Sequence, residues 1–170
     1  SADELPWDGA VGTVVYSRFP LGETTEVPGR FDLQNVLTSV EVPGLGPVGV
    51  AAVHPNRPRL GGDSWGPEQR ALISGLPDPG RNVVAGDFNA VDSHPTLRTL
   101  RREGYVSSGE LAGAGLQRTY PADRWFPPLI GIDHVLLGPE LTATSSRTVR
   151  VAGTDHLGLL VQIRPAVVGR

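Results

Sequence analysis

The sequence contains no cysteine, and this absence excludes disulfide bonds, thiolate nucleophiles and metal sites with sulfur ligands. It also contains no methionine, even at position 1, so we expect Ser1 to be either a processed end or the start of a piece of a longer chain. No window approaches the roughly 18 consecutive apolar residues that a membrane-spanning helix requires. The first residues also lack a signal-peptide pattern. The sequence as it stands therefore predicts a soluble protein.

Lysine is absent too: all 15 cationic residues are arginines, and they are scattered along the chain. With a formal net charge of −3, the sequence lacks the clustered basic residues that proteins binding nucleic acid nonspecifically normally show. This composition disfavours nucleic acid as a partner. The length of 170 residues is typical of one domain, and the many glycines and prolines, which follow no period, favour a fold rich in strands and loops.

Short stretches of β-branched and apolar residues predict strands, and two periodic stretches predict helices. The expected strands cover residues 11–18, 31–42, 48–53, 83–85, 132–137, 143–151 and 157–163, and the expected helices cover 64–76 and 93–104, the second with Ser93 as its N-cap and Gly104 at its end. The turn at 43–47 predicts a hairpin. A G-x-G-x-x-G pattern at 44–49 falls in that hairpin, which favours a turn over a dinucleotide-binding loop.

Residues 81–90 form the stretch around which the chain is organised. Val83 to Ala85 predict a buried strand that stops abruptly at Gly86. Asp87 and Asn89 follow two positions apart, so an extended backbone would project both side chains to one side while Phe88 enters the core. Taken alone, this pair is more typical of an Asx-type turn.

Two further stretches place an Asp followed by a His at or near a strand, Asp133-His134 and Asp155-His156, and three such carboxylates are harder to explain as turns. With G-D-F-N-A at 86–90, I-D-H-V-L at 132–136 and T-D-H-L-G-L at 154–159 in this order, the sequence resembles the endonuclease/exonuclease/phosphatase superfamily of metal-dependent phosphoesterases. The resemblance implies an α+β fold, a four-layer αββα sandwich of the DNase I type.

The resemblance also implies a role for each of these side chains. Asp155 matches the metal-associated aspartate of the superfamily, and the implied cofactor is Mg²⁺, or Mn²⁺ in its place. His156 matches the histidine beside the phosphate, and Asp133 the carboxylate that hydrogen-bonds it. Asp87 would orient or deprotonate the attacking water, and Asn89 would donate to a phosphoryl oxygen. The choice of general base between Asp87 and the His156–Asp133 pair stays open.

Two other histidines lie near these motifs. His54 ends the expected strand at 48–53, where a single histidine is usually structural. Superfamily members often carry a histidine at the end of the strand before G-D-F-N, so the resemblance adds His54 to the catalytic set. His134 alternates away from Asp133, which favours a packed side chain outside the site.

The segment 119–130 places several aromatic residues and prolines just before Asp133. Its rings would either pack into the core beneath a long loop or form an apolar wall for the substrate. In the second case Tyr120 and Trp125 would contact the substrate, and Arg124 would contact a second phosphate. The sequence leaves both alternatives open.

The superfamily's opening half, which supplies an Asn at the end of the first strand and a metal-binding Glu, has no counterpart in this sequence. Residues 1–170 therefore resemble the C-terminal portion of a single domain. Sheets that lack strands expose their edges and apolar faces. We accordingly expect the missing N-terminal half to exist as a preceding segment or as a separate chain.

The expected activity is the metal-dependent hydrolysis of a phosphoester, on a lipid-linked or small-molecule phosphate or diphosphate. The segment 119–125 together with I-D-H-V-L resembles membrane-anchored actinobacterial members, whose catalytic domains lie outside the membrane. This implies an extracellular or secreted location, with membrane contact only through a segment outside this chain. Two alternatives remain: a Mg²⁺-dependent nuclease, and an inactive or structural half that needs the missing segment.

Overall fold

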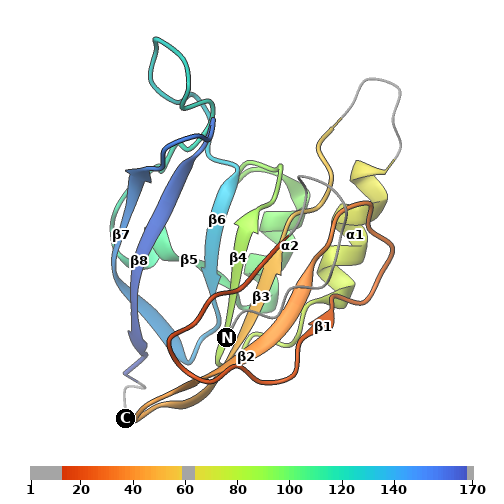
Figure 1. The fold of residues 1–170 in the computed structure, drawn as a ribbon, viewed down its shortest axis with the longest axis vertical. Helices are drawn as coiled ribbons and strands as arrows, with labels where there is room; N and C mark the ends of the chain where they lie inside the picture. The colour runs from red at the N-terminus through yellow and green to blue at the C-terminus, as the bar shows by residue number, and fades with distance from the viewer. Residues whose placement is uncertain (1–12, 59–63, 168–170) are drawn as a thin grey trace.

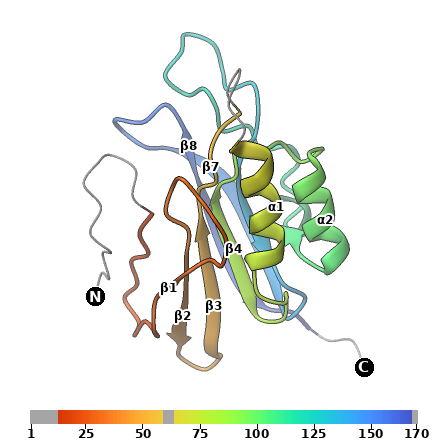
Figure 2. The same cartoon turned by 90° about the vertical axis from the view of Figure 1, so that its right-hand side faces the viewer.

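The computed structural model describes residues 13–58 and 64–167, which form a six-stranded mixed sheet, a two-stranded sheet and a layer of helices (Figure 1). The strand order in the large sheet is β1-β2-β3-β4-β6-β5, and the small sheet pairs β7 with β8. Helices α1 and α2 lie side by side on one face of the large sheet (Figure 2). This arrangement confirms the predicted α+β class.

After residue 36 the bounds of the elements follow the predicted stretches closely, except that β5 and α3 lie between 104 and 132, outside these stretches. The strands are β1 (Thr25–Glu26), β2 (Val36–Val42), β3 (Gly46–Val53), β4 (Asn82–Asp87), β5 (Val106–Ser107), β6 (Asp133–Leu137), β7 (Leu141–Arg150) and β8 (Leu157–Pro165). The helices are α1 (Trp65–Gly75), α2 (Pro95–Glu103) and α3 (Ser108–Leu111). No helix among the described residues is both long enough and apolar enough to cross a membrane.

The predicted hairpin is confirmed, because β2 and β3 are antiparallel and Val42 pairs with Gly46. Its turn is shorter than the predicted 43–47, since β3 already begins at Gly46. Gly44 and Gly46 have φ angles of 77° and 82°, a left-handed conformation that glycine adopts without strain. The G-x-G-x-x-G pattern is therefore turn and strand, as predicted, and no helix begins in it.

The register of three strands brings the candidate site residues to one edge of the large sheet. Strand β3 is parallel to β4 after a crossover through α1, and Val53 pairs with Gly86, so His54 and Asp87 follow side by side. Strand β6 is antiparallel to β4, and Asp133 at its start pairs with Asp87 at the end of β4. The carboxyl ends of two strands and the amino end of a third therefore meet at this edge.

A hydrophobic core beneath the two helices fixes these strands. Leu72 of α1, Leu100 of α2 and Val84 of β4 are fully buried in one cluster, and Phe88 joins them directly after β4. Burial of each such side chain contributes about 1.5–3 kcal/mol. Phe88 therefore enters the core as predicted and anchors the turn that follows Asp87.

The second helix begins one residue later than the sequence predicted. His94, not Ser93, is the N-cap, because its Nδ1 accepts a hydrogen bond from the backbone N–H of Thr96 at 3.3 Å, and Pro95 occupies the first helical position. The predicted end is confirmed, since Gly104 closes the helix with a left-handed φ of 111°.

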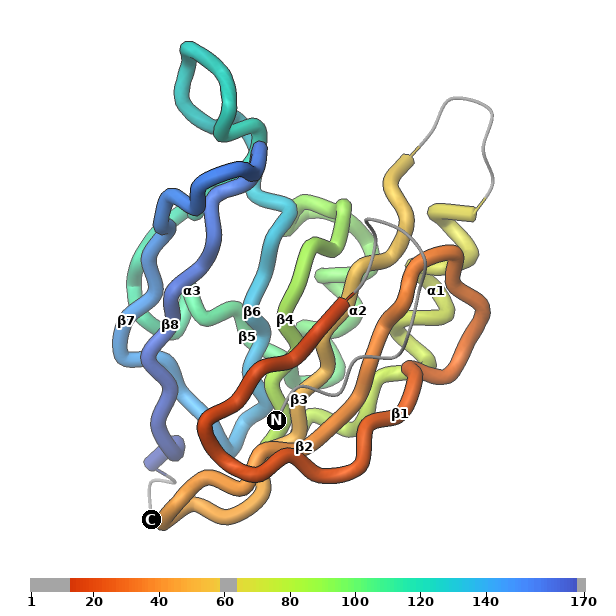
Figure 3. Tube along the Cα trace, in the orientation of Figure 1, coloured from red at the N-terminus to blue at the C-terminus, as the bar shows by residue number. Residues whose placement is uncertain are grey.

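The predicted strand at 11–18 is wrong for its described part, and residues 11 and 12 lie outside the described residues. The segment crosses the face of the large sheet opposite to the helices, with only an isolated bridge at Tyr16 (Figures 2 and 3). Its side chains alternate between half-buried and exposed, and the outward-facing Val14 and Tyr16 are 40% and 70% exposed. Alternation predicts a strand only where a neighbouring strand and a packed surface exist. Likewise, 31–35 is loop, and only the later part of the predicted 31–42 is strand.

The small sheet packs on the large one at the β6 side. Leu141 and Ala143 of β7 form a second buried cluster with Val48 and Leu137. Strand β8 leaves apolar side chains in solvent, however, with Leu160 48% and Ile163 39% exposed. Within the described residues, β7 and β8 pair only with each other.

Replacement of Gly86 by alanine should strongly destabilise the protein. Gly86 has a φ of 150°, and a Cβ there would overlap the backbone carbonyl oxygen of Val53. We expect Gly86→Ala to lower the free energy of unfolding by about 4 kcal/mol or more, because β3 and β4 must separate. The control is Gly44→Ala, at a φ of 77° with open space around it, for which only about 1–2 kcal/mol of backbone strain is expected. Chemical denaturation measures both, and equal losses would contradict the close approach.

Candidate active site

A histidine and two carboxylates form the centre of the site. The Nδ1 atom of His156 lies 2.8 Å from Oδ2 of Asp133, and one ligand atom from each of Asp87, Asp133 and His156 lies within 4.8 Å of the others. All three side chains are half-buried. The structure therefore brings together three of the residues that the sequence predicted for the site.

The turn between β7 and β8 carries His156 and is tied to the segment that begins at Thr119. The backbone N–H of Leu157 donates to the Thr119 carbonyl at 2.8 Å, and the N–H of Ala122 donates to the Asp155 carbonyl at 2.6 Å. The rings of Tyr120 and His156 pack together with their centroids 4.8 Å apart. Tyr120 therefore supports one side of the His156 imidazole while Asp133 holds its Nδ1.

His54 also reaches this cluster. Its Nε2 lies 3.7 Å from Oδ2 of Asp87, and the side chains are 35% and 18% exposed. The strand-end position that the sequence assigned to His54 therefore places it beside a predicted catalytic carboxylate, on the side of Asp87 that faces β3.

Asn89 occupies a tight turn and does not continue the strand. Its backbone N–H donates to Oδ1 of Asp87 at 2.8 Å, and its φ of 48° is left-handed. The Asx-type turn is therefore present, and the extended conformation expected as far as Asn89 is wrong, because the turn hydrogen bond and the buried Phe88 bend the chain. The Asn89 side chain donates from Nδ2 to the Pro55 carbonyl at 3.0 Å, so it joins the loop after β4 to the loop after β3.

The environment raises the pKa of Asp87 above the usual value of a carboxyl group. Burial is the main cause, and the negative charge of Asp133 adds to it, while the Asn89 N–H and the two histidines act in the opposite direction. A carboxylate whose pKa is raised holds a proton more readily than a solvated one. Asp87 is thus better suited to accept a proton from water than an exposed aspartate is.

The pKa of His156 is raised as well, although burial alone lowers it. The hydrogen bond with Asp133 and the negative charges of Asp133, Asp87 and Asp155 outweigh the effect of burial. These interactions favour the imidazolium form, which is a hydrogen-bond donor at both ring nitrogens. With Nδ1 on Asp133, Nε2 remains to face an anionic group.

His134 lies outside the site, as predicted. It is 6% exposed, its Nε2 lies 2.8 Å from the Ala90 carbonyl oxygen, and its ring meets the edge of Phe88 at 5.5 Å between centroids. The residue therefore packs beneath the turn that contains Asn89.

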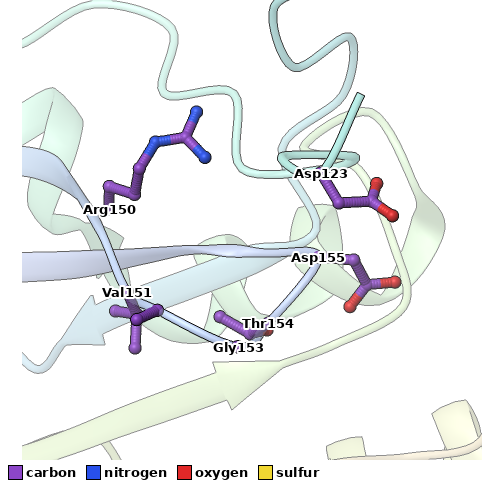
Figure 4. Close-up of a pocket in the computed structure, with 7 residues that line it drawn as sticks. Asp123, Arg150, Val151, Gly153, Thr154 and Asp155 are labelled. Carbon is purple, nitrogen blue, oxygen red and sulfur yellow. The ribbon is translucent and has the colours of Figure 1, made fainter. Parts of the chain in front are cut away.

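Asp155, the predicted metal ligand, lies at the border of the cluster. Its Oδ1 is 4.0 Å from Nε2 of His156, and its side chain is 53% exposed. It lines an open hollow of about 950 Å³ together with Asp123, Arg150 and the turn 151–154. Figure 4 shows Asp123 and Asp155 on one side of this hollow and Arg150 on the other. The Arg150 guanidinium donates from Nη1 to the Ala122 carbonyl at 3.0 Å. The three converging side chains are thus Asp87, Asp133 and His156, with Asp155 next to them.

The loop between Tyr120 and Ile130 projects from the end of the molecule that carries the site (Figure 3). Trp125 is 95% exposed and contacts the Phe126 ring edge-on at 5.6 Å. The alternative in which Trp125 packs into the core is therefore wrong. Arg124 pairs with the neighbouring Asp123 at 3.3 Å. Of the three predicted substrate residues, the structure places Tyr120 against the cluster and leaves Arg124 and Trp125 on the projecting loop.

Sequence reasoning missed three buried polar residues that hold the loops of the site. They are Asn35, Glu68 and Gln69, each 2% exposed. Two of them, Glu68 and Gln69, lie in the expected helix at 64–76. A signal was present, since Glu68 lies four positions before the buried Leu72 and hence on the same face of the helix.

The donor set fits a divalent cation. The carboxylate oxygens of Asp87 and Asp133 are hard ligands of the kind that Mg²⁺ and Mn²⁺ prefer. The fold holds these like charges together, and Asp133 contributes to the raised pKa of Asp87. A cation between them would relieve this repulsion. His156 would stay outside the coordination sphere, because an imidazolium donates at both ring nitrogens and has no free lone pair.

Without added metal, the contribution of the His156–Asp133 pair to stability should fall as the pH rises. A raised folded-state pKa stabilises the fold fully below the unfolded pKa of about 6.5, and this contribution is lost as the pH rises through the higher folded value. We expect Asp133→Asn in EDTA to cost about 1 kcal/mol more at about pH 6 than at about pH 9. Glu140→Gln, at an exposed partner of Arg81, is the control and should show no such difference. Equal costs of Asp133→Asn at both pH values in denaturant titrations would contradict the pairing.

Comparisons with known proteins identify the family and the fold. The model of the Endonuclease/Exonuclease/phosphatase family matches residues 7–156, and no curated protein matches the chain. A solved endonuclease/exonuclease/phosphatase from Beutenbergia cavernae is similar with a TM-score of 0.73 and 22% identity, over 88% of this chain and 46% of that one. This chain thus spans about half of that structure.

Two further solved structures share the fold at lower identity. A Bacteroides thetaiotaomicron mannosyl-6-phosphatase gives a TM-score of 0.58 at 13% identity, over 83% of this chain and 67% of that one. D. rerio TDP2 complexed with a single-strand DNA product gives 0.58 at 13% identity, over 85% and 68%. With its three motifs gathered at one edge of the sheet and a family model that matches most of its length, the chain belongs to the endonuclease/exonuclease/phosphatase family, whose members are generally hydrolases of phosphoesters.

Proposed function

We propose that the chain carries the catalytic centre of a phosphoester hydrolase that depends on a divalent metal, Mg²⁺ or Mn²⁺. The observation that supports this most is the convergence of Asp87, Asp133 and His156 within 4.8 Å of one another. Asp87 and Asp133 would hold the metal, with Asp155 close enough to bind through a water molecule. When bound, the metal supplies positive charge to a phosphoryl oxygen and to the leaving oxygen.

The side chains of His156, Asp87 and His54 have different roles in this proposal. His156, kept protonated by Asp133, donates from Nε2 to a phosphoryl oxygen and stabilises the charge that develops there. Asp87 would bind the metal through one carboxylate oxygen and accept the proton of the attacking water through the other, because the imidazolium of His156 cannot act as a base. His54, 3.7 Å from Asp87, keeps the carboxylate in place.

Substitution of the two central residues should abolish most of the turnover. We expect Asp87→Asn and His156→Ala each to lower kcat by roughly 10²-fold or more, because each removes a group that acts in the transition state. Asp78→Asn, an exposed aspartate near the opposite end of β4, is the control and should leave kcat unchanged. Full activity of Asp87→Asn would contradict its role as proton acceptor.

The neighbourhood of the site supports a substrate with an apolar part. Large apolar side chains are exposed on the projecting loop and on the adjoining turn: Trp125 is 95%, Leu129 57%, Ile130 41% and Val151 50% exposed. Because Tyr120 at the base of this loop packs on His156, the apolar surface begins beside the phosphate position. We therefore propose a lipid-linked phosphate or diphosphate, and a domain that works at the outer face of a membrane.

The alternative substrate is nucleic acid, as in the D. rerio TDP2 structure with its DNA product. The net charge of −3 and the scattered arginines disfavour it. With Mg²⁺ we expect phosphate release from an isoprenoid diphosphate and no nicking of supercoiled plasmid, and neither reaction in EDTA. Trp125→Ala should lower kcat/KM about 10-fold for the isoprenoid substrate and leave a short water-soluble phosphate ester unaffected. Plasmid nicking, or equal losses on both esters, would overturn the lipid assignment.

We also propose that the active unit contains a further polypeptide segment, in the same or a separate chain. The exposed apolar residues of β8 and the length of the matched structures, of which this chain spans 46–68%, support it. The segment would add strands beside β7 and β8 and a further carboxylate to the metal site. The activity measurements above are accordingly made on the chain alone and with the further segment added. If neither form turns over a phosphoester, the chain serves as a structural half without activity.

A further inference from the structure

Helix α1 touches both loops that carry the candidate catalytic residues, and it does so through two adjacent buried side chains. Oε2 of Glu68 accepts a hydrogen bond from the backbone N–H of Asn56 at 2.6 Å, in the loop that follows His54. Nε2 of Gln69 donates to the backbone carbonyl of Phe88 at 2.7 Å, in the turn that follows Asp87. One helical turn thus holds the backbone on both sides of the His54–Asp87 contact.

Further hydrogen bonds hold the loop that contains His54. The backbone N–H of His54 donates to Oδ1 of Asn35 at 2.6 Å, and the second carboxylate oxygen of Glu68 accepts from the N–H of Asp32 at 3.0 Å. The side chain of Asn89 links the two loops directly through the Pro55 carbonyl. Each of these bonds has a backbone group at one end, so together they fix the course of the two loops.

Burying the polar side chains of Glu68 and Gln69 costs free energy that apolar side chains filling the same space would not cost. Both are 2% exposed, and a buried charge is tolerated only when its oxygens are hydrogen-bonded, as those of Glu68 are. Oε1 of Gln69 has no hydrogen-bond partner among the described residues, so this side chain carries a desolvation cost that an apolar side chain of the same size would avoid. What the glutamine adds is the hydrogen bond to the Phe88 carbonyl.

We propose that Glu68 and Gln69 are positioning residues, which together set the separation of His54 and Asp87 and thereby the orientation of the Asp87 carboxylate. The 3.7 Å between His54 Nε2 and Asp87 Oδ2 is the distance that they maintain. The effect of Glu68 and Gln69 on turnover rests on the proposed function. Their effect on the positions of the two loops does not. A displacement of about 1 Å in a reacting group can cost as much as about 10²-fold in rate.

The test uses near-isosteric variants in the complete protein. Gln69→Met keeps the shape and removes the donor to Phe88, and Glu68→Gln keeps one acceptor and turns an amide N–H toward a backbone N–H. Leu72→Val, one turn further along α1 and fully buried, is the control for general loosening of the helix. Crystal structures give the His54–Asp87 distance, and steady-state kinetics with an isoprenoid diphosphate give kcat and KM separately.

We expect both variants to lengthen the His54–Asp87 distance and to lower kcat about 10-fold with KM within about twofold of wild type, because the substrate contacts remain. Leu72→Val should lower the melting temperature and leave kcat unchanged. The proposal is overturned if the distance is preserved in both variants, or if kcat stays at the wild-type value although the loops have moved. Where the wild-type protein turns over no phosphoester, the proposed function fails, and the distances alone decide whether the two residues hold the loops.

Discussion

Asp87 and Asp133 stand directly opposite each other across the antiparallel strands β4 and β6, and the compensation of their charges determines the chemistry of this region. Like charges in this position destabilise a sheet, and here burial adds to the effect by raising the pKa of Asp87. His156 binds Asp133 at 2.8 Å, and His54 lies 3.7 Å from Asp87. The partly exposed imidazoles of His156 and His54 offset only part of the repulsion between the two carboxylates. The pair can therefore still bind a cation.

The sheet and its hydrophobic core provide a rigid scaffold, and strand ends and loops carry the candidate catalytic side chains. Strand register brings Asp87 next to His54 and opposite Asp133, because Val53 pairs with Gly86 without room for a Cβ. The hydrophobic cluster under α1 and α2 fixes this register. His156 arrives from the other sheet, on a turn tied to the segment 119–122. Loops on a stable scaffold thus carry the functional groups, a common division in enzymes.

Local sequence patterns predicted what depends on local structure. The apolar run before Gly86 and the Asp-His motif at 133–134 gave the strands that carry Asp87 and Asp133, since a buried strand is visible in its own residues. Contacts between distant segments were not visible in this way. Which segments become neighbours decides, for example, that Gln69 donates a 2.7 Å hydrogen bond to the Phe88 carbonyl. It also decides that Val14 stays exposed although its segment alternates like a strand. The bend at Asn89 followed from an Asx turn that the sequence also allowed.

The proposed catalytic centre depends on one cation bound between the two strands, and the position of this cation can be observed directly. Crystals of the complete protein soaked in Mn²⁺ and measured at the manganese absorption edge would locate the ion by anomalous scattering. We predict a peak within about 2.0–2.6 Å of carboxylate oxygens from both Asp87 and Asp133, and its loss in Asp87→Asn. A peak bound elsewhere, or no peak between these residues at saturating Mn²⁺, would contradict the proposed catalytic centre.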